Sequence, residues 1–290
     1  MKFCQSLMYA PAGQFVALTK AAEDAGFDQV SLSDHVFYPA ELRSAYPYRA
    51  DGAPQFPPDT EWPDVWVTMG ALAAATTTIT FSTHVYVLPA RNPFVVAKAV
   101  GTAAFLSGGR ARLGIGAGWM EEEFEQLGQP FAGRGGRMEE MVAVLRTLWQ
   151  GGMVEHHGEH YDFGPLQMAP VPVEPVPIYV GGHSEVALRR AAAIGDGWMG
   201  IDYAMEDLVR HVRRIDELRK EAGRDHLPFE HVAAVQDLPR PEVVEELEAV
   251  GLGTLITSAW LIAGGDTSSL EQNLDALGRF GETYLPPLRS

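Results

Sequence analysis

One histidine in this 290-residue sequence stands where a side chain could carry a proton during a reaction. His35 directly follows Asp34, at the end of a short apolar run that begins at Phe27. Imidazole titrates near neutral pH, so a histidine in this place can donate or accept a proton. A purely structural role is the alternative, because many single histidines only support the fold.

The string Gly181-Gly182-His183-Ser184 follows another apolar run and opens a predicted helix. Glycine lets a ligand approach the backbone, and the first free N–H groups of a helix attract an anion. Phosphate is the natural ligand for such a site. A plain turn, with Ser184 as the N-cap of the helix, is the alternative.

Glycines alternate with other residues in the string Gly114-Ile115-Gly116-Ala117-Gly118. A dinucleotide-binding fingerprint would need a further glycine at position 119 or 121, which hold Trp119 and Glu121. The string therefore does not match that fingerprint. At the end of a strand these glycines would clear space for a flat ring, or they would serve tight packing between strand and loop.

Other catalytic chemistry has few signals in the sequence. Three histidines (His156, His157 and His160) lie in a glycine-containing segment that looks like an exposed hairpin, and we predict no metal site. We interpret the run Glu121–Glu123 as a solvated helix start, where negative charge is favourable. No G-x-S-x-G or G-x-x-x-x-G-K motif occurs, so acyl transfer and nucleotide hydrolysis lack their usual signals.

The elements that would position these residues alternate regularly along the chain. Eight short apolar runs bounded by glycines or polar residues predict buried strands at Lys2–Met8, Phe27–Ser33, Ile79–Val87, Arg110–Gly116, Pro177–Gly181, Gly197–Ile201, His231–Gln236 and Gly253–Ser258. Helical patterns lie between them, at Gln14–Ala25, Asp64–Ala75, Pro93–Leu106, Arg134–Trp149, Ser184–Ile194, Met205–Ala222, Pro241–Val250 and Leu270–Tyr284. This alternation predicts an α/β fold of the (β/α)8 TIM-barrel type; a doubly wound open sheet is the alternative.

Two long segments interrupt the alternation, one after the second strand and one between the fourth and fifth strands. The first, Val36–Pro63, is rich in Pro, Tyr and Phe, and the second, Gly151–Pro175, ends in a proline-rich stretch. In a barrel, the loops that follow strands lie on the catalytic face. We therefore predict that the first insertion forms a wall of the pocket; a surface ornament is the alternative.

Composition narrows the possible partners and the cell compartment. Acidic residues outnumber basic ones by 38 to 22, giving a net charge of −16, and no long Lys/Arg run is present, so we expect neither nucleic acid nor a membrane surface as partner. One cysteine, Cys4, cannot form an internal disulfide. No apolar stretch reaches the ~18 residues of a membrane span. We expect a cytoplasmic protein with a single domain over residues 1–290.

Several ordered blocks resemble the luciferase-like monooxygenase superfamily, and within it the branch that uses the deazaflavin coenzyme F420. The blocks fall within roughly residues 1–200. They are Ser33-Asp34-His35-Val36, Leu88-Pro89-x-Arg91-Asn92-Pro93, Leu106-Ser107-Gly108-Gly109-Arg110, Leu113–Trp119, Glu123-Phe124, Leu127-Gly128, Phe131, Arg134-Gly135-x-Arg137-x-x-Glu140, Pro177–Gly182 and Gly195–Trp198.

The resemblance implies a cofactor at the carboxyl face of the barrel and a homodimer. It also implies a cis peptide bond that does not involve proline, within Thr83-His84-Val85 and most simply at His84–Val85. It places an Asp–His pair beside the deazaflavin ring, a glycine turn around that ring and a backbone site for its phosphate. The matching positions in this chain are Asp34 and His35; Gly116, Gly118 and Trp119; and Gly181, Gly182, His183 and Ser184.

The chain departs from the sugar-phosphate dehydrogenases of that branch at two places. Where those proteins have an acidic residue directly after the glycine turn, this chain has Trp119. Where they have a tryptophan shortly after the Asp–His pair, it has the stretch Val36–Pro39. We therefore expect an apolar substrate pocket, lined by Trp119, Phe37, Tyr38 and Trp260, in place of a sugar-phosphate site.

Together these features predict an F420-dependent oxidoreductase that passes a hydride between the deazaflavin and a small apolar substrate, with His35 as the catalytic proton carrier. Two alternatives stay open. One is a two-component monooxygenase that uses FMN and dioxygen. The other is a flavin- or deazaflavin-binding protein without catalytic activity.

Overall fold

The main sheet closes on itself. A computed structural model of the chain describes residues 1–285. Its parallel strands follow the order β3-β2-β1-β11-β10-β9-β8-β5-β4, and β3 also pairs with β5, which completes the ring. The strands are β1 (Lys2–Ser6), β2 (Gln29–Leu32), β3 (Thr80–Thr83), β4 (Tyr86–Val87), β5 (Ala111–Gly116), β8 (Ile178–Gly181), β9 (Gly197–Tyr203), β10 (Glu230–Val235) and β11 (Leu252–Thr257).

The strands β3 and β4 occupy one position in the ring. They are separated only by residues 84 and 85, and both pair with β5. Counting them together gives the eight strands that the sequence predicts. The TIM barrel is thus confirmed, and the open-sheet alternative is wrong because the pairing of β3 with β5 leaves no open edge there.

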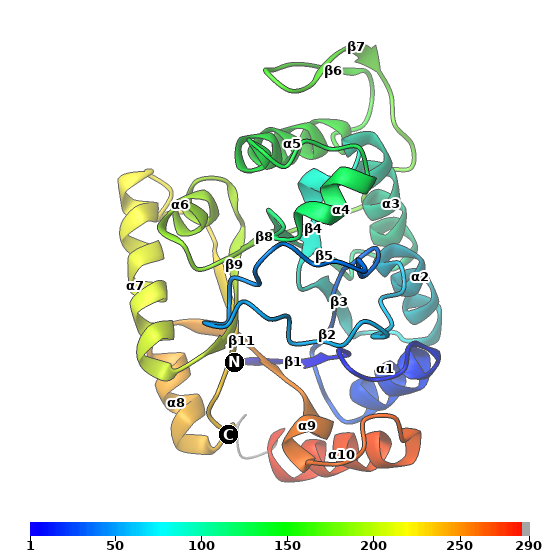
Figure 1. The fold of residues 1–290 in the computed structure, drawn as a ribbon, viewed down its shortest axis with the longest axis vertical. Helices are drawn as coiled ribbons and strands as arrows, with labels where there is room; N and C mark the ends of the chain where they lie inside the picture. The colour runs from blue at the N-terminus through cyan, green and yellow to red at the C-terminus, as the bar shows by residue number, and fades with distance from the viewer. Residues whose placement is uncertain (286–290) are drawn as a thin grey trace.

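Helices surround the barrel, as Figure 1 shows. They are α1 (Phe15–Asp24), α2 (Val65–Ala75), α3 (Pro93–Leu106), α4 (Glu121–Gln126), α5 (Arg134–Leu148), α6 (Glu185–Ile194), α7 (Met205–Glu221), α8 (Pro241–Ala249), α9 (Ala259–Ala263) and α10 (Leu270–Thr283). Several begin at side-chain caps that the sequence signals. The Asp64 carboxylate accepts from the N–H groups of Trp66 and Val67, and Asn92 caps α3 in the same way.

The two insertions take different courses. Residues 33–64 connect β2 to α2 and cross the front of the barrel in the view of Figure 1. Residues 149–177 form the antiparallel hairpin of β6 (Val154–His157) and β7 (Asp162–Leu166), which stands out beyond α5. The hairpin that the glycine-containing segment predicts is confirmed. Within residues 1–285, no helix has both the length and the apolar composition needed to cross a membrane.

Candidate active site

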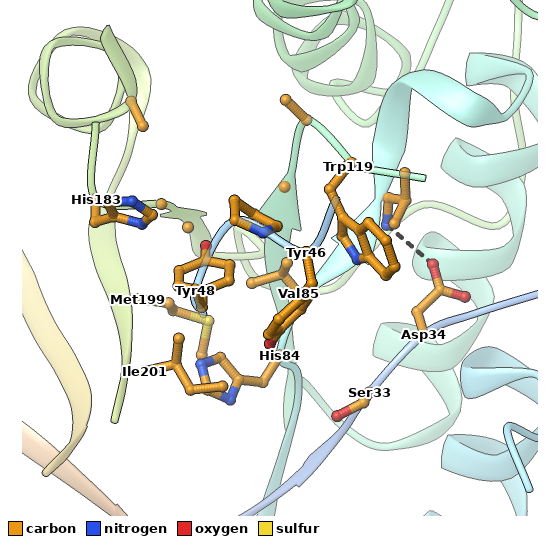
Figure 2. A pocket seen from close by; sticks show the side chains of 18 of the residues that line it. Ser33, Asp34, Tyr46, Tyr48, His84, Val85, Trp119, His183, Met199 and Ile201 are labelled. Atoms are coloured by element: carbon orange, nitrogen blue, oxygen red, sulfur yellow. Dashed lines mark hydrogen bonds between the residues drawn. The ribbon is translucent and has the colours of Figure 1, made fainter. Parts of the chain in front are cut away.

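A cavity of about 500 Å³ opens at the carboxyl ends of the strands. Its volume lies in the range of small-molecule sites, which is about 300–1,000 Å³. Figure 2 shows His183, Met199 and Ile201 on one side of this pocket and Asp34 and Trp119 on the other. Of the residues predicted from the sequence, those that line it are Asp34, His35, His84, Val85, Gly116, Gly118, Trp119, Gly181, Gly182, His183 and Ser184.

The bottom of the pocket is a close packing of Val85 against two glycines. The peptide bond His84–Val85 is cis, as the resemblance implies. A Cβ atom on Gly116 would lie 2.6 Å from Val85 Cγ2, and one on Gly181 would lie 2.9 Å from Val85 Cγ1. Any side chain at either position would collide with Val85, so the two glycines are what admits Val85 between β5 and β8.

Thr83 and His84 come directly before Val85, and of these two only His84 lines the pocket. Thr83 is fully buried. Its hydroxyl donates to the carbonyl of Gly114 at 2.7 Å, which links the end of β3 to β5. Burial lowers the pKa of His84 to about 4, although a hydrogen bond to the backbone of Gly200 opposes the shift. His84 is therefore neutral at physiological pH.

Asp34 acts on the backbone beside the pocket. Its carboxylate accepts from the N–H of Val87 at 2.9 Å (the dashed line in Figure 2) and from the guanidinium of Arg91 at 2.8 Å. Burial raises the pKa of Asp34, and Arg91 counteracts this effect. The ion pair and the backbone hydrogen bond together hold β4 against the end of β2.

His35 lies in an aromatic cage. Its ring centroid is 4.8 Å from that of Phe56, 5.5 Å from that of Trp62 and 5.9 Å from that of Trp119. Its Nδ1 atom is 3.3 Å from Oε1 of Glu123, and 10% of its side chain is exposed. Aromatic rings, most of them from the first insertion, surround the imidazole at this end of the pocket, where Asp34 also lies.

The interpretation of Glu121–Glu123 as a solvated helix start is wrong for two of the three residues. Glu122 and Glu123 are 5% and 2% exposed. Glu122 accepts from the N–H groups of Arg43 at 2.6 Å and Ser44 at 3.1 Å, and Glu123 accepts from the N–H of Val36 at 2.7 Å. Both carboxylates thus bind the first insertion.

The same contacts account for the acidity of Glu122. Burial acts to raise the pKa of Glu122, but backbone N–H donors and the Ser44 hydroxyl outweigh it and lower the pKa to about 2. The carboxylate stays charged at any physiological pH. The anchor of the first insertion is therefore permanent under cellular conditions.

The opposite end of the pocket is suited to an anion. Gly182 has φ +122°, and Ser184 caps α6 by accepting from the N–H of Ala187 at 3.3 Å. The cap that the sequence offers as an alternative is thus present, and Ser184 also lines the pocket. The Nδ1 atom of His183 is buried without a hydrogen-bond partner. An unpaired buried polar atom costs about 1–3 kcal/mol, so it favours a polar ligand at this position.

Two arginines that the sequence analysis did not single out as site residues line the same end. They are Arg134, at the start of α5, and Arg190, on α6. A Cβ on Gly135 would lie 2.4 Å from Nη2 of Arg190, so this glycine makes room for the guanidinium. The signal in the sequence was the spacing Arg134-Gly135-Gly136, which puts a cation and two small residues at a helix N-terminus.

Three predicted substrate-pocket residues lie elsewhere. Trp260 on α9 is 1% exposed and packs in the core, because α9 buries its ring against the body of the barrel. Tyr38 packs behind Phe56, with ring centroids 6.1 Å apart, and neither Tyr38 nor Phe37 lines the pocket. Most of the aromatic residues that line it with Trp119 come from further along the insertion, namely Tyr46, Tyr48, Phe56 and Trp62, and Tyr9 after β1 is a further one.

The histidines of the hairpin pair with carboxylates. His156 lies 3.2 Å from Glu140, and His157 contacts Asp162. In the described part of the chain, no group of three or more His, Cys, Asp or Glu side chains could hold a metal ion.

The family model for luciferase-like monooxygenases matches residues 3–274. The chain belongs to this family. It is 38% identical over 274 residues to an uncharacterised protein of Mycobacterium tuberculosis, covering 93% of this chain and 94% of that protein. It is 31% identical over 222 residues to an F420-dependent glucose-6-phosphate dehydrogenase of Gordonia bronchialis, covering 73% and 60%. The second similarity supports membership of the F420-dependent branch.

Solved structures share the fold. An F420-dependent secondary alcohol dehydrogenase in complex with an F420–acetone adduct superposes with a TM-score of 0.76 at 19% identity, over 100% of this chain and 99% of that one. The oxygenating constituent of 3,6-diketocamphane monooxygenase from Pseudomonas putida, in complex with FMN, gives 0.72 at 16% identity, over 99% and 98%.

Proposed function

We propose that the protein is an F420-dependent oxidoreductase that transfers a hydride between the deazaflavin and a small apolar organic substrate. The observation that carries this proposal is the two-ended pocket, with an aromatic cage around His35 at one end and a glycine and arginine site at the other. The similarity to an F420-dependent dehydrogenase of Gordonia bronchialis supports it.

The residues present fit a ring-bearing phosphate cofactor. Gly116 and Gly181 make room for the Val85 side chain, and a flat ring would lie above Val85 in the pocket that all three residues line. The unpaired Nδ1 of His183, with Arg134 and Arg190, would hold the phosphate. When bound, the deazaflavin would supply the hydride chemistry, and the protein would supply orientation and proton transfer.

The cage points to the substrate class. Phe56, Trp62 and Trp119 surround His35, and the arginines that line the pocket lie at the phosphate end. A sugar phosphate would bring charge into the apolar end, where burial of an unpaired charge is costly. We therefore propose an uncharged substrate that presents one polar group to His35, the catalytic proton carrier.

Titration of the purified protein with coenzyme F420 and, separately, with FMN tests the cofactor. We expect a calorimetric or fluorescence response to F420 at micromolar concentration or below, and weaker binding of FMN. The absence of any response to F420 would contradict the proposal. Tight FMN binding with dioxygen consumption would instead indicate the monooxygenase, the reaction class of the FMN-bearing structural neighbour.

A His35→Ala variant separates an enzyme from a binding protein. We expect the variant to bind F420 while losing about 10²–10⁴-fold in turnover of uncharged alcohols and ketones, the usual contribution of general acid–base catalysis. If both forms bind F420 and neither turns over any member of the panel, the role is binding without catalysis.

We also propose a homodimer formed through the outer faces of α2 and α3. The sequence of α2 contains no charged residue, and that of α3 contains only Lys98. Val67, Val95 and Leu106 on these helices are 76%, 67% and 67% exposed. In a chain of net charge −16, this is a face where two copies could meet without repulsion. Sedimentation should show a dimer, and Val67→Asp with Val95→Asp a monomer.

A further inference from the structure

The position of the proton on His35 follows from the contacts of one carboxylate oxygen. Oε1 of Glu123 accepts the N–H of Val36 at 2.7 Å, so this oxygen is an acceptor. The same oxygen lies 3.3 Å from Nδ1 of His35. An atom that faces an occupied acceptor at this distance must donate to it, so Nδ1 carries the hydrogen in the neutral imidazole.

We infer that Glu123 is a positioning residue that fixes the Nδ1–H tautomer of His35 and leaves Nε2 as a free proton acceptor. It rests on the proposed role of His35 as proton carrier, and it identifies Nε2 as the ring atom that takes the proton. It uses the logic of a carboxylate that orients a catalytic histidine through Nδ1–H.

The aromatic neighbours of the His35 imidazole cannot fix its tautomer. Phe56, Trp62 and Trp119 contact its faces and edges and offer it no carboxylate or carbonyl side chain. Glu123 from α4 contacts the imidazole, and Asp34 at the end of β2 interacts with it electrostatically. Asp34 is paired with Arg91, so the charge of Glu123 is the one left to stabilise an imidazolium.

This arrangement sets the chemistry of the proposed step. Neutral His35 can only accept at Nε2. A substrate O–H or N–H would give its proton to that atom, and the adjacent carbon would give up its hydride to the deazaflavin when that cofactor is bound. The substrate thus loses two electrons and two hydrogens, and a C=O or C=N bond forms. The substrate class is therefore an apolar molecule with hydrogen on both carbon and an attached oxygen or nitrogen; in the reverse reaction the imidazolium would return the proton to the C=O or C=N product.

NMR of protein labelled with ¹⁵N-histidine measures the tautomer directly, without cofactor or substrate. The signals of His35 are identified by their loss in His35→Gln. We expect the wild type to show Nδ1–H and unprotonated Nε2. Glu123→Gln keeps an oxygen that can accept from both Val36 and His35, so it should keep the tautomer. Glu123→Ala removes the acceptor and should shift at least half of the population to Nε2–H.

Glu122→Gln is the matched control. It removes a charge from the adjacent carboxylate, which binds the same insertion but does not contact the imidazole, and it should leave the tautomer unchanged. A wild type with Nε2–H, or a Glu123→Ala variant that folds and keeps Nδ1–H, would overturn the inference. A protein with the expected tautomer that fails to bind F420 would overturn the proposed cofactor alone.

Discussion

The two insertions of this barrel are anchored by the same device and end up with different roles. Glu122 on α4 accepts from two consecutive backbone N–H groups of the first insertion, at Arg43 and Ser44. Glu140 on α5 accepts from two consecutive N–H groups of the second, at His160 and Tyr161. The first insertion supplies much of the pocket lining, whereas the hairpin of the second supplies none of it.

The difference comes from where each insertion leaves the barrel. The first starts directly at the carboxyl end of β2, which is the edge where the pocket opens. The second leaves the end of α5, so it emerges outside the barrel wall and packs on α5 and α3. An anchored loop thus becomes part of a site only if its attachment point faces the site.

The largest expected effect is on cofactor affinity, when the anchoring carboxylates Glu122 and Glu140 are removed one at a time. Glu122→Ala should weaken F420 binding by about 10-fold or more, because a freed insertion must be ordered again when the cofactor binds. Glu140→Ala should change it by less than about twofold. Fluorescence titration measures both. Equal losses would mean that the hairpin also shapes the pocket.

The two anchors should respond alike to acid. The pKa of Glu122 is lowered to about 2, and backbone N–H donors also lower the pKa of Glu140. Groups with depressed pKa values stabilise the fold above their unfolded pKa of about 4.3 and lose that contribution as the pH falls through the folded value. Each carboxylate should therefore contribute about 2 kcal/mol at pH 7 and progressively less below pH 4.

Urea unfolding of Glu122→Gln and Glu140→Gln at pH 7 and near pH 3 tests this. Each variant should be less stable than the wild type at pH 7, and the gap should narrow at pH 3. A gap that stays constant with pH would show that the charge of the carboxylate does not matter.

A smaller difference between the insertions is expected from one aromatic contact in each of them. Tyr48 of the first insertion contacts the ring of His183 at 4.8 Å, and Phe163 of the hairpin contacts Phe94 at 5.1 Å. Tyr48→Ala should speed F420 release about 3- to 10-fold, because a ring contact above the phosphate end contributes about 1 kcal/mol. Phe163→Ala should leave the release rate unchanged. Stopped-flow displacement with excess competitor would record both.

The smallest effect is expected from shortening the hairpin. Replacing residues 155–162 by a short Gly-Ser turn should leave the affinity for F420 within about twofold of the wild type and lower the melting temperature by only a few degrees. A loss of affinity beyond tenfold would place the second insertion at the site after all.

The fold could be predicted from local patterns. Each strand of the barrel lies in a short, largely apolar run, and α2, α3, α6 and α10 begin at side-chain caps, so the alternation along the chain survives in the barrel. The role of Gly116 and Gly181 could also be predicted, because glycines at a strand end indicate that another group packs closely against the backbone there. The structure shows that what approaches them is Val85.

The wall of the pocket could not be predicted in the same way. Glu122 and Glu123 looked like ordinary residues of a charged helix start, and their partners lie 78 to 88 positions earlier in the sequence. Local periodicity carries no information about such contacts. Trp260 was misplaced for a related reason: a large ring near a strand end can turn toward the core as well as toward the cavity, and here it is buried.

The packing of Val85 between Gly116 and Gly181 has a consequence for redesign. Substitutions that add volume at Gly116 on β5 or Gly181 on β8 would collide with the Val85 side chain, so these two positions offer no room for change. The rings of Tyr46, Tyr48, Phe56 and Trp62 belong to a loop and carry no strand pairing. A new substrate range would therefore be sought by varying these four positions while the barrel is kept intact.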